Sequence, residues 1–172
     1  MVKNESGGAL ESLHQYETAT LSSENFKEFK EQLIDLMVDC FPQYDMTREF
    51  AGSIISKQFL GDQSVVALLT KKSDHALVGF SKAHIYTDHP ELANIQFTGI
   101  VNSQRGNKLV GVLIERLEDE LRRRNVQFVR RQSRIKDGYA DAVERHYGDR
   151  IVEKKEPEPS DKDPKRFFKI RL

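Results

Sequence analysis

The spacing of hydrophobic residues predicts one short strand followed by two helices. Residues 15–21 alternate loosely between polar and apolar positions, which is typical of a strand. Apolar residues then recur at three- and four-residue steps over Phe26–Phe41, the period of a helix with one buried face. The pattern repeats over Thr47–Leu60. Pro42 and Gly61 follow the two runs and are expected to end them.

Three strands and a long helix are predicted next. The strands cover Ser64–Thr70, Ala76–Thr87 and Ala93–Val101, and the first two form a hairpin. In the third strand, alternation places Ile95, Phe97, Gly99 and Val101 on one face. A helix follows over Lys108–Arg124, with an apolar stripe made of Leu109, Val112, Leu113, Leu117 and Leu121.

The remaining pattern completes a mixed fold. A strand is predicted to start at Val126–Val129, followed by a helix over Gly138–Tyr147 and by strands at 151–152 and Arg166–Leu172. The order β-α-α-β-β-β-α-β-α-β-β predicts an α+β (mixed α/β) fold, with a central mixed sheet of about seven strands and helices on both faces. We expect residues 1–10 to be disordered and 11–172 to form a single domain.

The composition excludes several classes of protein. The 172 residues contain 27 basic and 27 acidic side chains, which argues against a protein that coats nucleic acid. The single cysteine, Cys40, excludes an internal disulfide framework and a cysteine-rich zinc site. No apolar run approaches the roughly 18–20 residues of a membrane span, and no secretory signal is visible. We therefore expect a cytoplasmic protein without a metal, and the five histidines have no metal-binding spacing.

The neutral total conceals an uneven distribution of charge. Residues 1–63 contain 5 basic and 11 acidic groups, whereas residues 105–150 contain 12 basic and 8 acidic groups. The sharpest feature is a basic cluster at Arg122, Arg123, Arg124, Arg130, Arg131 and Arg134. Cations at a helix C-terminus and a solvated strand edge would explain it. Contact with a phosphate, an acidic partner or a nucleic acid is the functional alternative.

The segment from Gln96 to Val110 is the most informative for chemistry. It predicts a strand that runs through a short polar loop directly into a helix. Free N–H groups and a partial positive charge at a helix N-terminus suit a phosphate, and Arg105, Asn107 and Lys108 add donors. The alternative is an ordinary strand-to-helix turn with a charged, solvated cap.

This segment and the element order resemble the GNAT superfamily of acyl-CoA-dependent N-acetyltransferases. The family's fingerprint is an aliphatic strand end, a short loop, and Arg/Gln-x-x-Gly-x-Gly/Ala opening a helix. Ile100 matches the strand end and Arg105 begins the motif. Lys108 and Val110 stand where the family has small residues. The element order matches over nearly the whole chain, and the local pattern matches over about residues 95–124.

The resemblance implies an acetyl-CoA site without a metal. Two strands would separate near a bulge, for which Gly99 is the candidate, and the pantetheine arm would lie in the gap. Backbone groups of Ile100 and Asn102 would bond the arm, and amides of residues 106–110 would hold the pyrophosphate. The implied cofactor residues are Ile100, Val101, Asn102, Arg105, Gly106, Asn107, Lys108, Leu109 and Val110.

The resemblance also implies a proton donor and a base. The family's donor is often a Tyr in a pattern that Asp137-x-x-Ala140-x-x-Val143-Glu144 follows, so Glu144 takes the Tyr position. Tyr147, one helical turn later, is the preferred catalytic candidate, and Tyr139 is the other. For the base, His84 and Glu91 are the candidates. Gln96 cannot serve as a base, and a water or no base remains open.

The implied function is transfer of an acetyl group from acetyl-CoA to a primary amine, by direct attack in a ternary complex. The acceptor would be a small-molecule amine or a protein or peptide amine, and the acidic N-terminal helices would favour a cationic one. A homodimer through Arg166–Leu172 is left open, and a membrane partner is not expected. The alternative is a catalytically degenerate domain that binds a partner or nucleic acid through Arg122–Arg134.

Overall fold

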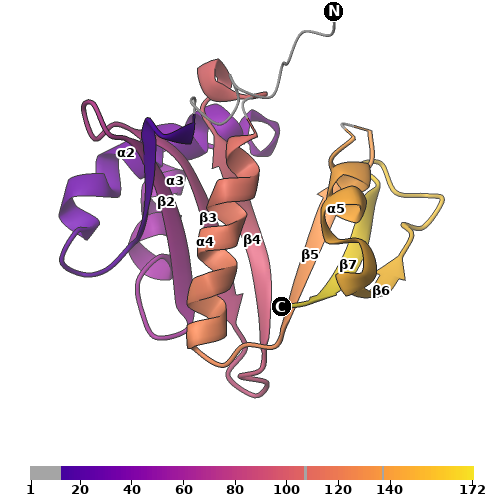
Figure 1. Cartoon of the computed structure of the whole chain (residues 1–172). Coiled ribbons are helices and arrows are strands. Elements are labelled where there is room, and N and C mark those ends of the chain that lie inside the picture. The colour runs from indigo at the N-terminus through magenta and orange to yellow at the C-terminus, as the bar shows by residue number, and fades with distance from the viewer. Residues whose placement is uncertain (1–12, 107, 137) are drawn as a thin grey trace, which may run out of the picture.

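The computed structural model describes residues 13–106, 108–136 and 138–172, and these form one seven-stranded sheet with helices on both sides (Figure 1). The strands are β1 (Tyr16–Thr20), β2 (Ser64–Lys71), β3 (Leu77–Ile85), β4 (Leu92–Ile100), β5 (Phe128–Arg134), β6 (Ile151–Lys155) and β7 (Lys165–Arg171). The α-helices are α2 (Phe26–Cys40), α3 (Arg48–Gln58), α4 (Leu109–Arg123) and α5 (Tyr139–Tyr147). The predicted fold class and element order are confirmed. Segment 1–10, predicted to be disordered, lies outside the described residues.

The sheet has the strand order β1-β2-β3-β4-β5-β7-β6. Neighbouring strands are antiparallel except for the parallel pair β4 and β5, which helix α4 connects. Strand β7 is paired on one side with β5 and on the other with β6. Strand β7 therefore lies inside the sheet and β6 forms that edge, and a homodimer through Arg166–Leu172 stays a prediction.

Two hydrophobic clusters hold the layers together. Helices α2 and α3 bury residues such as Leu33 and Ile55 against one face of the sheet. Helices α4 and α5 bury residues such as Leu117 and Val143 against the other face. Each helix thus covers the sheet with its apolar stripe, as the three- and four-residue periodicity predicts.

Local signals in the sequence set several element ends. Thr47 is the N-cap of α3, and its Oγ1 accepts a hydrogen bond of 3.2 Å from the backbone N–H of Phe50. Asn125 adopts a left-handed conformation with φ 62°, which ends α4 and turns the chain toward β5. Strand β5 runs beyond the predicted Val126–Val129, because β7 pairs with it from Phe128 to Arg134.

Candidate functional site

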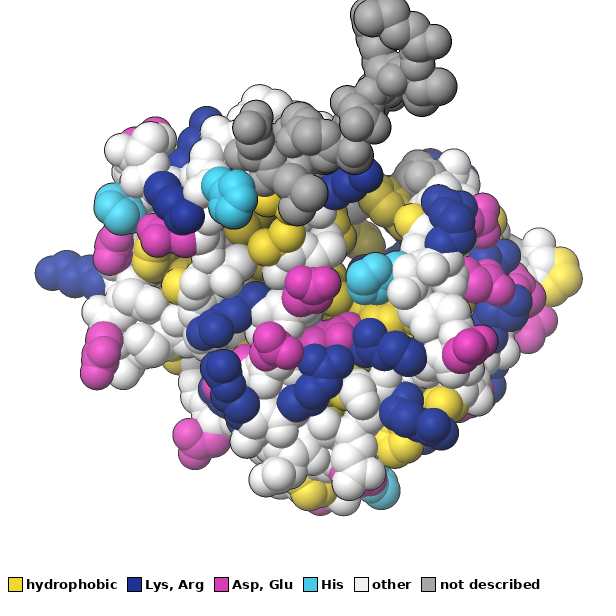
Figure 2. All heavy atoms as spheres, in the orientation of Figure 1, with side chains coloured by type: hydrophobic (Ala, Val, Ile, Leu, Met, Phe, Trp, Pro, Cys, Tyr) yellow, Lys and Arg dark blue, Asp and Glu magenta, His cyan; other side chains and the backbone are white. Residues whose placement is uncertain are grey.

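Strands β4 and β5 enclose a gap that widens toward their C-terminal ends. They pair only from Leu92 with Phe128 to Ile95 with Arg131, and both strands then continue without pairing to each other. Figure 1 shows them diverging, and Figure 2 shows a recess between the two halves of the molecule. Facing strand edges without a ladder partner present backbone N–H and C=O groups to an extended ligand that carries amides.

A bulge at Gln96 marks the closed end of this gap. Ala83 of β3 pairs with Ile95, but Lys82 pairs with Phe97, so Gln96 is the extra residue. The bulge interrupts the side-chain alternation of β4. Ile95 therefore packs with α4 and α5 whereas Phe97 packs with α2 and α3, and the prediction that both share one face is wrong.

Gly99 has a different role from the one predicted. The register is regular at this residue, so it does not mark the bulge. A Cβ placed on Gly99 would lie 2.9 Å from the Sγ of Cys40 at the end of α2. Gly99 therefore allows helix α2 to approach β4 closely.

The wide end of the gap lies beside the N-terminus of helix α4. Lys108 is the residue before the helix and has a left-handed conformation with φ 59°, without a side-chain cap. The first-turn N–H groups of an α-helix have no intrahelical partners and attract an anion. Beside them, a Cβ on Gly106 or Gly111 would meet no atom within 4 Å, so the space over the helix start is open.

The predicted cofactor residues separate into two groups in this loop. Asn102 donates a hydrogen bond of 3.1 Å to Asp39 of α2, and Arg105 Nε donates one of 3.0 Å to the Ile100 carbonyl. These side chains thus bond to α2 and to the strand end. Lys108 and Val110 are exposed at the helix start, Leu109 is buried in the core, and Asn107 lies outside the described residues. Val101 and Gly106 complete the loop backbone.

Tyr147 is buried between α5 and α4, close to the closed end of the gap. Its side chain is 3% exposed, and among the described residues its hydroxyl has no hydrogen-bond partner. Burial, and then the negative charge of nearby Glu118, raise the pKa of the Tyr147 hydroxyl. The phenol is therefore protonated at neutral pH and has a proton to donate.

Glu144, at the position of the family's usual Tyr, is bound elsewhere. Its carboxylate oxygens accept hydrogen bonds from Lys154 at 2.7 Å and Arg166 at 2.9 Å. The bond from Lys154 is the main cause of the lowered pKa of Glu144. Tyr139, the other tyrosine candidate, is 55% exposed at the start of α5. Asp137, which opens the motif, lies outside the described residues.

The two candidate bases lie at different places on the sheet. His84 pairs with Asn94 inside the β3–β4 ladder. Burial, and then the charge of Lys82, lower the pKa of His84, which keeps the imidazole neutral at pH 7. Glu91 precedes β4 and lies beside His89, with 3.4 Å between Oε1 and Nδ1. The structure therefore does not bring His84 and Glu91 together.

Sequence reasoning missed Lys82, which interrupts the apolar strand β3. It is only 1% exposed, and its Nζ donates a hydrogen bond to the side chain of Gln96. Burial lowers the pKa of its ammonium to about 8. With His84 and Gln96 it lines a depression of about 450 Å³ beside the end of α3. The signal in the sequence was a charged residue within a run of apolar ones.

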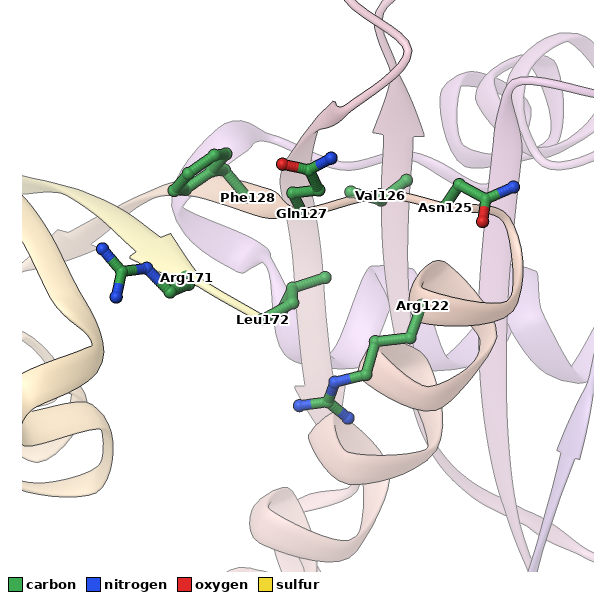
Figure 3. A pocket seen from close by; sticks show the side chains of 7 residues that line it. All are labelled: Arg122, Asn125, Val126, Gln127, Phe128, Arg171 and Leu172. Carbon is green, nitrogen blue, oxygen red and sulfur yellow. The ribbon is translucent and has the colours of Figure 1, made fainter.

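A second depression, of about 420 Å³, lies at the opposite end of α4 from the open helix start. Figure 3 shows its lining, which consists of Arg122, Asn125, Val126, Gln127, Phe128, Arg171 and Leu172. Its walls come from the end of α4 and from the ends of β5 and β7 where they pair. This depression is therefore remote from the gap's wide end.

Acidic groups and aromatic rings neutralise or cover most of the basic cluster. Arg122 pairs with Glu118 and Asp119, Arg123 and Arg124 pair with Glu120, and Arg134 pairs with Asp163. The guanidinium of Arg130 lies 6.0 Å from the ring centroids of Tyr86 and Phe167. These contacts explain the cluster largely by intramolecular packing.

Comparison with known proteins agrees with this geometry. No protein-family model and no curated sequence matches the chain. Among solved structures, the ribosomal-protein-S18-alanine N-acetyltransferase of Escherichia coli has a TM-score of 0.67 at 14% identity, covering 91% of this chain and 94% of its own. An aminoglycoside 6′-N-acetyltransferase complexed with coenzyme A has a TM-score of 0.69 at 14% identity (90% and 96%). A GNAT-family acetyltransferase of Streptococcus pneumoniae has a TM-score of 0.63 at 13% identity (91% and 99%).

This chain has the GNAT fold. The gap between β4 and β5 is thus the part of the GNAT fold in which the resemblance places acyl-CoA. The unpaired strand edges and the open space beside Gly106 and Gly111 fit an amide-bearing arm and its phosphates. Two residues depart from the GNAT motif: Lys108 adopts the left-handed conformation that favours Gly, and Val110 exposes an apolar side chain at the helix start.

Two searches of the described residues bear on metals and membranes. Among these residues, no group of three or more His, Cys, Asp or Glu side chains is placed to hold a metal ion. None of the described helices is long and apolar enough to cross a membrane.

Proposed function

We propose that this protein is an acyl-CoA-dependent N-acetyltransferase, which moves an acetyl group from acetyl-CoA to a primary amine within a ternary complex. The observation that supports this most directly is the gap between β4 and β5, whose wide end lies at the N-terminus of α4. The gap suits the extended pantetheine arm, and the helix N-terminus suits the phosphates. When bound, the donor supplies an activated thioester carbonyl.

The chain's own groups would divide the work of binding. Backbone amides of Gly106 and of Lys108–Val110 would bind the pyrophosphate, and Lys108 would add a positive charge. The Ile100 carbonyl is already bonded to Arg105, so the facing backbone edges of β4 beyond Ile95 and of β5 beyond Arg131 hold most of the arm. This arrangement directs the thioester to the closed end of the gap, beside Gln96.

Tyr147 is the proposed proton donor. The acceptor nitrogen forms a C–N bond with the carbonyl carbon, the C–S bond breaks, and Tyr147 gives its proton to the departing thiolate. The hydroxyl is buried near the closed end of the gap, and its raised pKa keeps it protonated until the thiolate forms beside it.

The acceptor nitrogen must lose a proton, and His84 is better placed than Glu91 to receive it. His84 lines the same depression as the bulge residue Gln96, whereas Glu91 lies outside the ladder beside His89. The lowered pKa of His84 keeps its imidazole unprotonated at pH 7.

The alternative function, a surface that binds polyanions, is weakened by ion pairs within the fold. These pairs engage Arg122, Arg123, Arg124 and Arg134.

An acetyl-transfer assay tests the proposal. Purified protein is incubated with acetyl-CoA and a panel of amines, and acetylated product is identified by mass spectrometry while the release of free thiol is followed. We expect product formation that depends on both the amine and the protein. Absence of acetylated product with every amine, at saturating acetyl-CoA, would contradict the proposed function.

A further inference from the structure

Lys82 is a buried cation without an acidic partner among the described residues. Its one described polar contact is the hydrogen bond from Nζ to the neutral side chain of Gln96. Buried charges in proteins are usually paired, because removal from water is costly. An ammonium has three N–H donors, so Lys82 has donors left for a ligand. A buried ammonium without a counter-ion lowers the stability of the fold. Because Lys82 lines a depression, a bound anion could supply the missing counter-ion.

The depression that Lys82 lines is positioned for the acceptor. Helices α4 and α5 cover the face of the sheet on which Tyr147 lies. Helices α2 and α3 pack on the other face, and the depression opens there, beside the end of α3. Lys82 and Gln96 lie on that other face, next to Phe80 and Phe97. Both of these rings pack against Phe59, which follows α3. Gln96 itself follows Ile95, the last residue of β4 that pairs with β5, and so lies where the gap closes.

The charges around this depression favour an anionic group on the acceptor. Lys57 and Lys82 are basic, Asp62 is the one acidic residue of its lining, and the lowered pKa of His84 leaves that ring neutral. A purely cationic amine, such as a polyamine, would meet net repulsion. A carboxylate would give the Lys82 ammonium the counter-ion it lacks, in a charge-assisted hydrogen bond.

We propose that this depression binds the carboxylate of a small amino acid-like acceptor through Lys82, with the acceptor's amine placed at the closed end of the gap beside Gln96. The inference rests on the proposed function and names its substrate class. A volume of about 450 Å³ accommodates a molecule of this size. The positive neighbours also lower the pKa of the bound amine, which favours its nucleophilic, neutral form.

This assignment revises the expectation that the acidic N-terminal helices attract a cationic amine. Several of those acidic groups have partners within the fold. Arg48 forms ion pairs with both Glu31 and Asp35, and Asp39 accepts the hydrogen bond from Asn102. The acidic excess of the N-terminal part therefore does not line the depression, to which it contributes Asp62 alone.

Matched acceptors test the inference. Free amino acids are compared with their primary amides, and lysine with cadaverine, in the acetyl-transfer assay with wild-type protein, Lys82→Met and Lys27→Met. Lys27 is exposed at the start of α2 and does not line the depression, so it controls for the loss of one positive charge. We expect wild-type protein and Lys27→Met to prefer the carboxylate form by about tenfold or more in kcat/KM, and Lys82→Met to lose that preference. In parallel, only the carboxylate form should stabilise the CoA-bound wild-type protein against heat.

The outcomes separate the inference from the function on which it rests. If amides or cadaverine are acetylated as well as the amino acids, or if Lys82→Met keeps the preference, the inference is wrong and the acetyltransferase function stands. If no amine is acetylated although amino acids stabilise the protein through Lys82, the proposed function is wrong and carboxylate binding stands. If neither occurs, both are wrong.

Discussion

Arg150 donates a hydrogen bond of 2.7 Å from Nη2 to Oε2 of Glu118, and this contact joins helix α4 to the segment that follows α5. The Glu118 side chain is only 3% exposed, and the same oxygen also accepts a bond of 2.9 Å from Arg122. Beyond the closed end of the gap, β4 and β5 are not paired, so contacts between α4 and the C-terminal part fix how far the two halves stand apart.

Replacement of Glu118 by Ala should therefore lower the free energy of unfolding by about 3 kcal/mol, because two arginines lose a buried partner. Chemical denaturation followed by circular dichroism measures the change. Glu115→Ala, at an exposed position of the same helix, is the control and should alter stability by less than about 0.5 kcal/mol. Equal effects of the two substitutions would argue against a special role for Glu118.

Tyr147→Phe should reduce kcat by about 100-fold or more while leaving the fold intact. The hydroxyl is buried beside the carboxylate of Glu118, whose Oε1 has no other described partner, so its removal costs the fold at most this one contact. Glu144→Gln provides the comparison, since Glu144 occupies the motif position but is engaged with Lys154 and Arg166. A larger loss of kcat in Glu144→Gln than in Tyr147→Phe would show that Tyr147 has been misassigned.

Hydrophobic periodicity was sufficient to predict the element order, because each helix and strand buries one stripe of its own residues. The strand-to-helix loop at Arg105 was also visible, since it depends on local sequence. The separation of β4 from β5 could not be predicted from the sequence, because it depends on strand register. The bulge at Gln96 inserts one residue into β4, which sends Ile95 and Phe97 to opposite faces despite their even spacing. The contact between Lys82 and Gln96 depends on this bulge, so the sequence alone did not predict it.

The stability contributed by Lys82 should depend on pH. Burial lowers the pKa of its ammonium to about 8 from an ordinary value of 10.5. Between these values the unfolded chain binds a proton that the folded chain has released, so the penalty for the buried charge is complete below pH 8 and disappears as the pH rises toward 10.5. Lys82→Met should therefore raise the free energy of unfolding at pH 7 by about 2 kcal/mol, with a smaller gain at pH 10. Urea titrations at both pH values measure this, and a gain that is the same at both would contradict it.

Gly99→Ala should destabilise the protein by about 1–3 kcal/mol, because the new methyl group would overlap the Cys40 side chain. Cys40→Ala in the same chain should restore part of the loss, and this non-additivity would demonstrate the contact. Gly111→Ala is the matched control, since a Cβ there meets no atom within 4 Å. Thermal denaturation of the wild type, Gly99→Ala, Cys40→Ala, the double variant and Gly111→Ala measures these effects, and a tolerated Gly99→Ala would show that α2 can move away from β4.

The central claim is that the gap between β4 and β5 and the start of α4 bind acyl-CoA, and titration calorimetry with coenzyme A tests it most directly. We predict saturable binding that stabilises the fold by about 2.7 kcal/mol at a hundredfold excess over Kd. Lys108→Glu should weaken that binding by about tenfold or more. Lys27→Glu should not, because Lys27 is exposed at the start of α2, at the far end of this helix from Cys40, which bonds to Ile100. Absence of coenzyme A binding to the folded wild-type protein, or equal affinity in Lys108→Glu, would contradict the account.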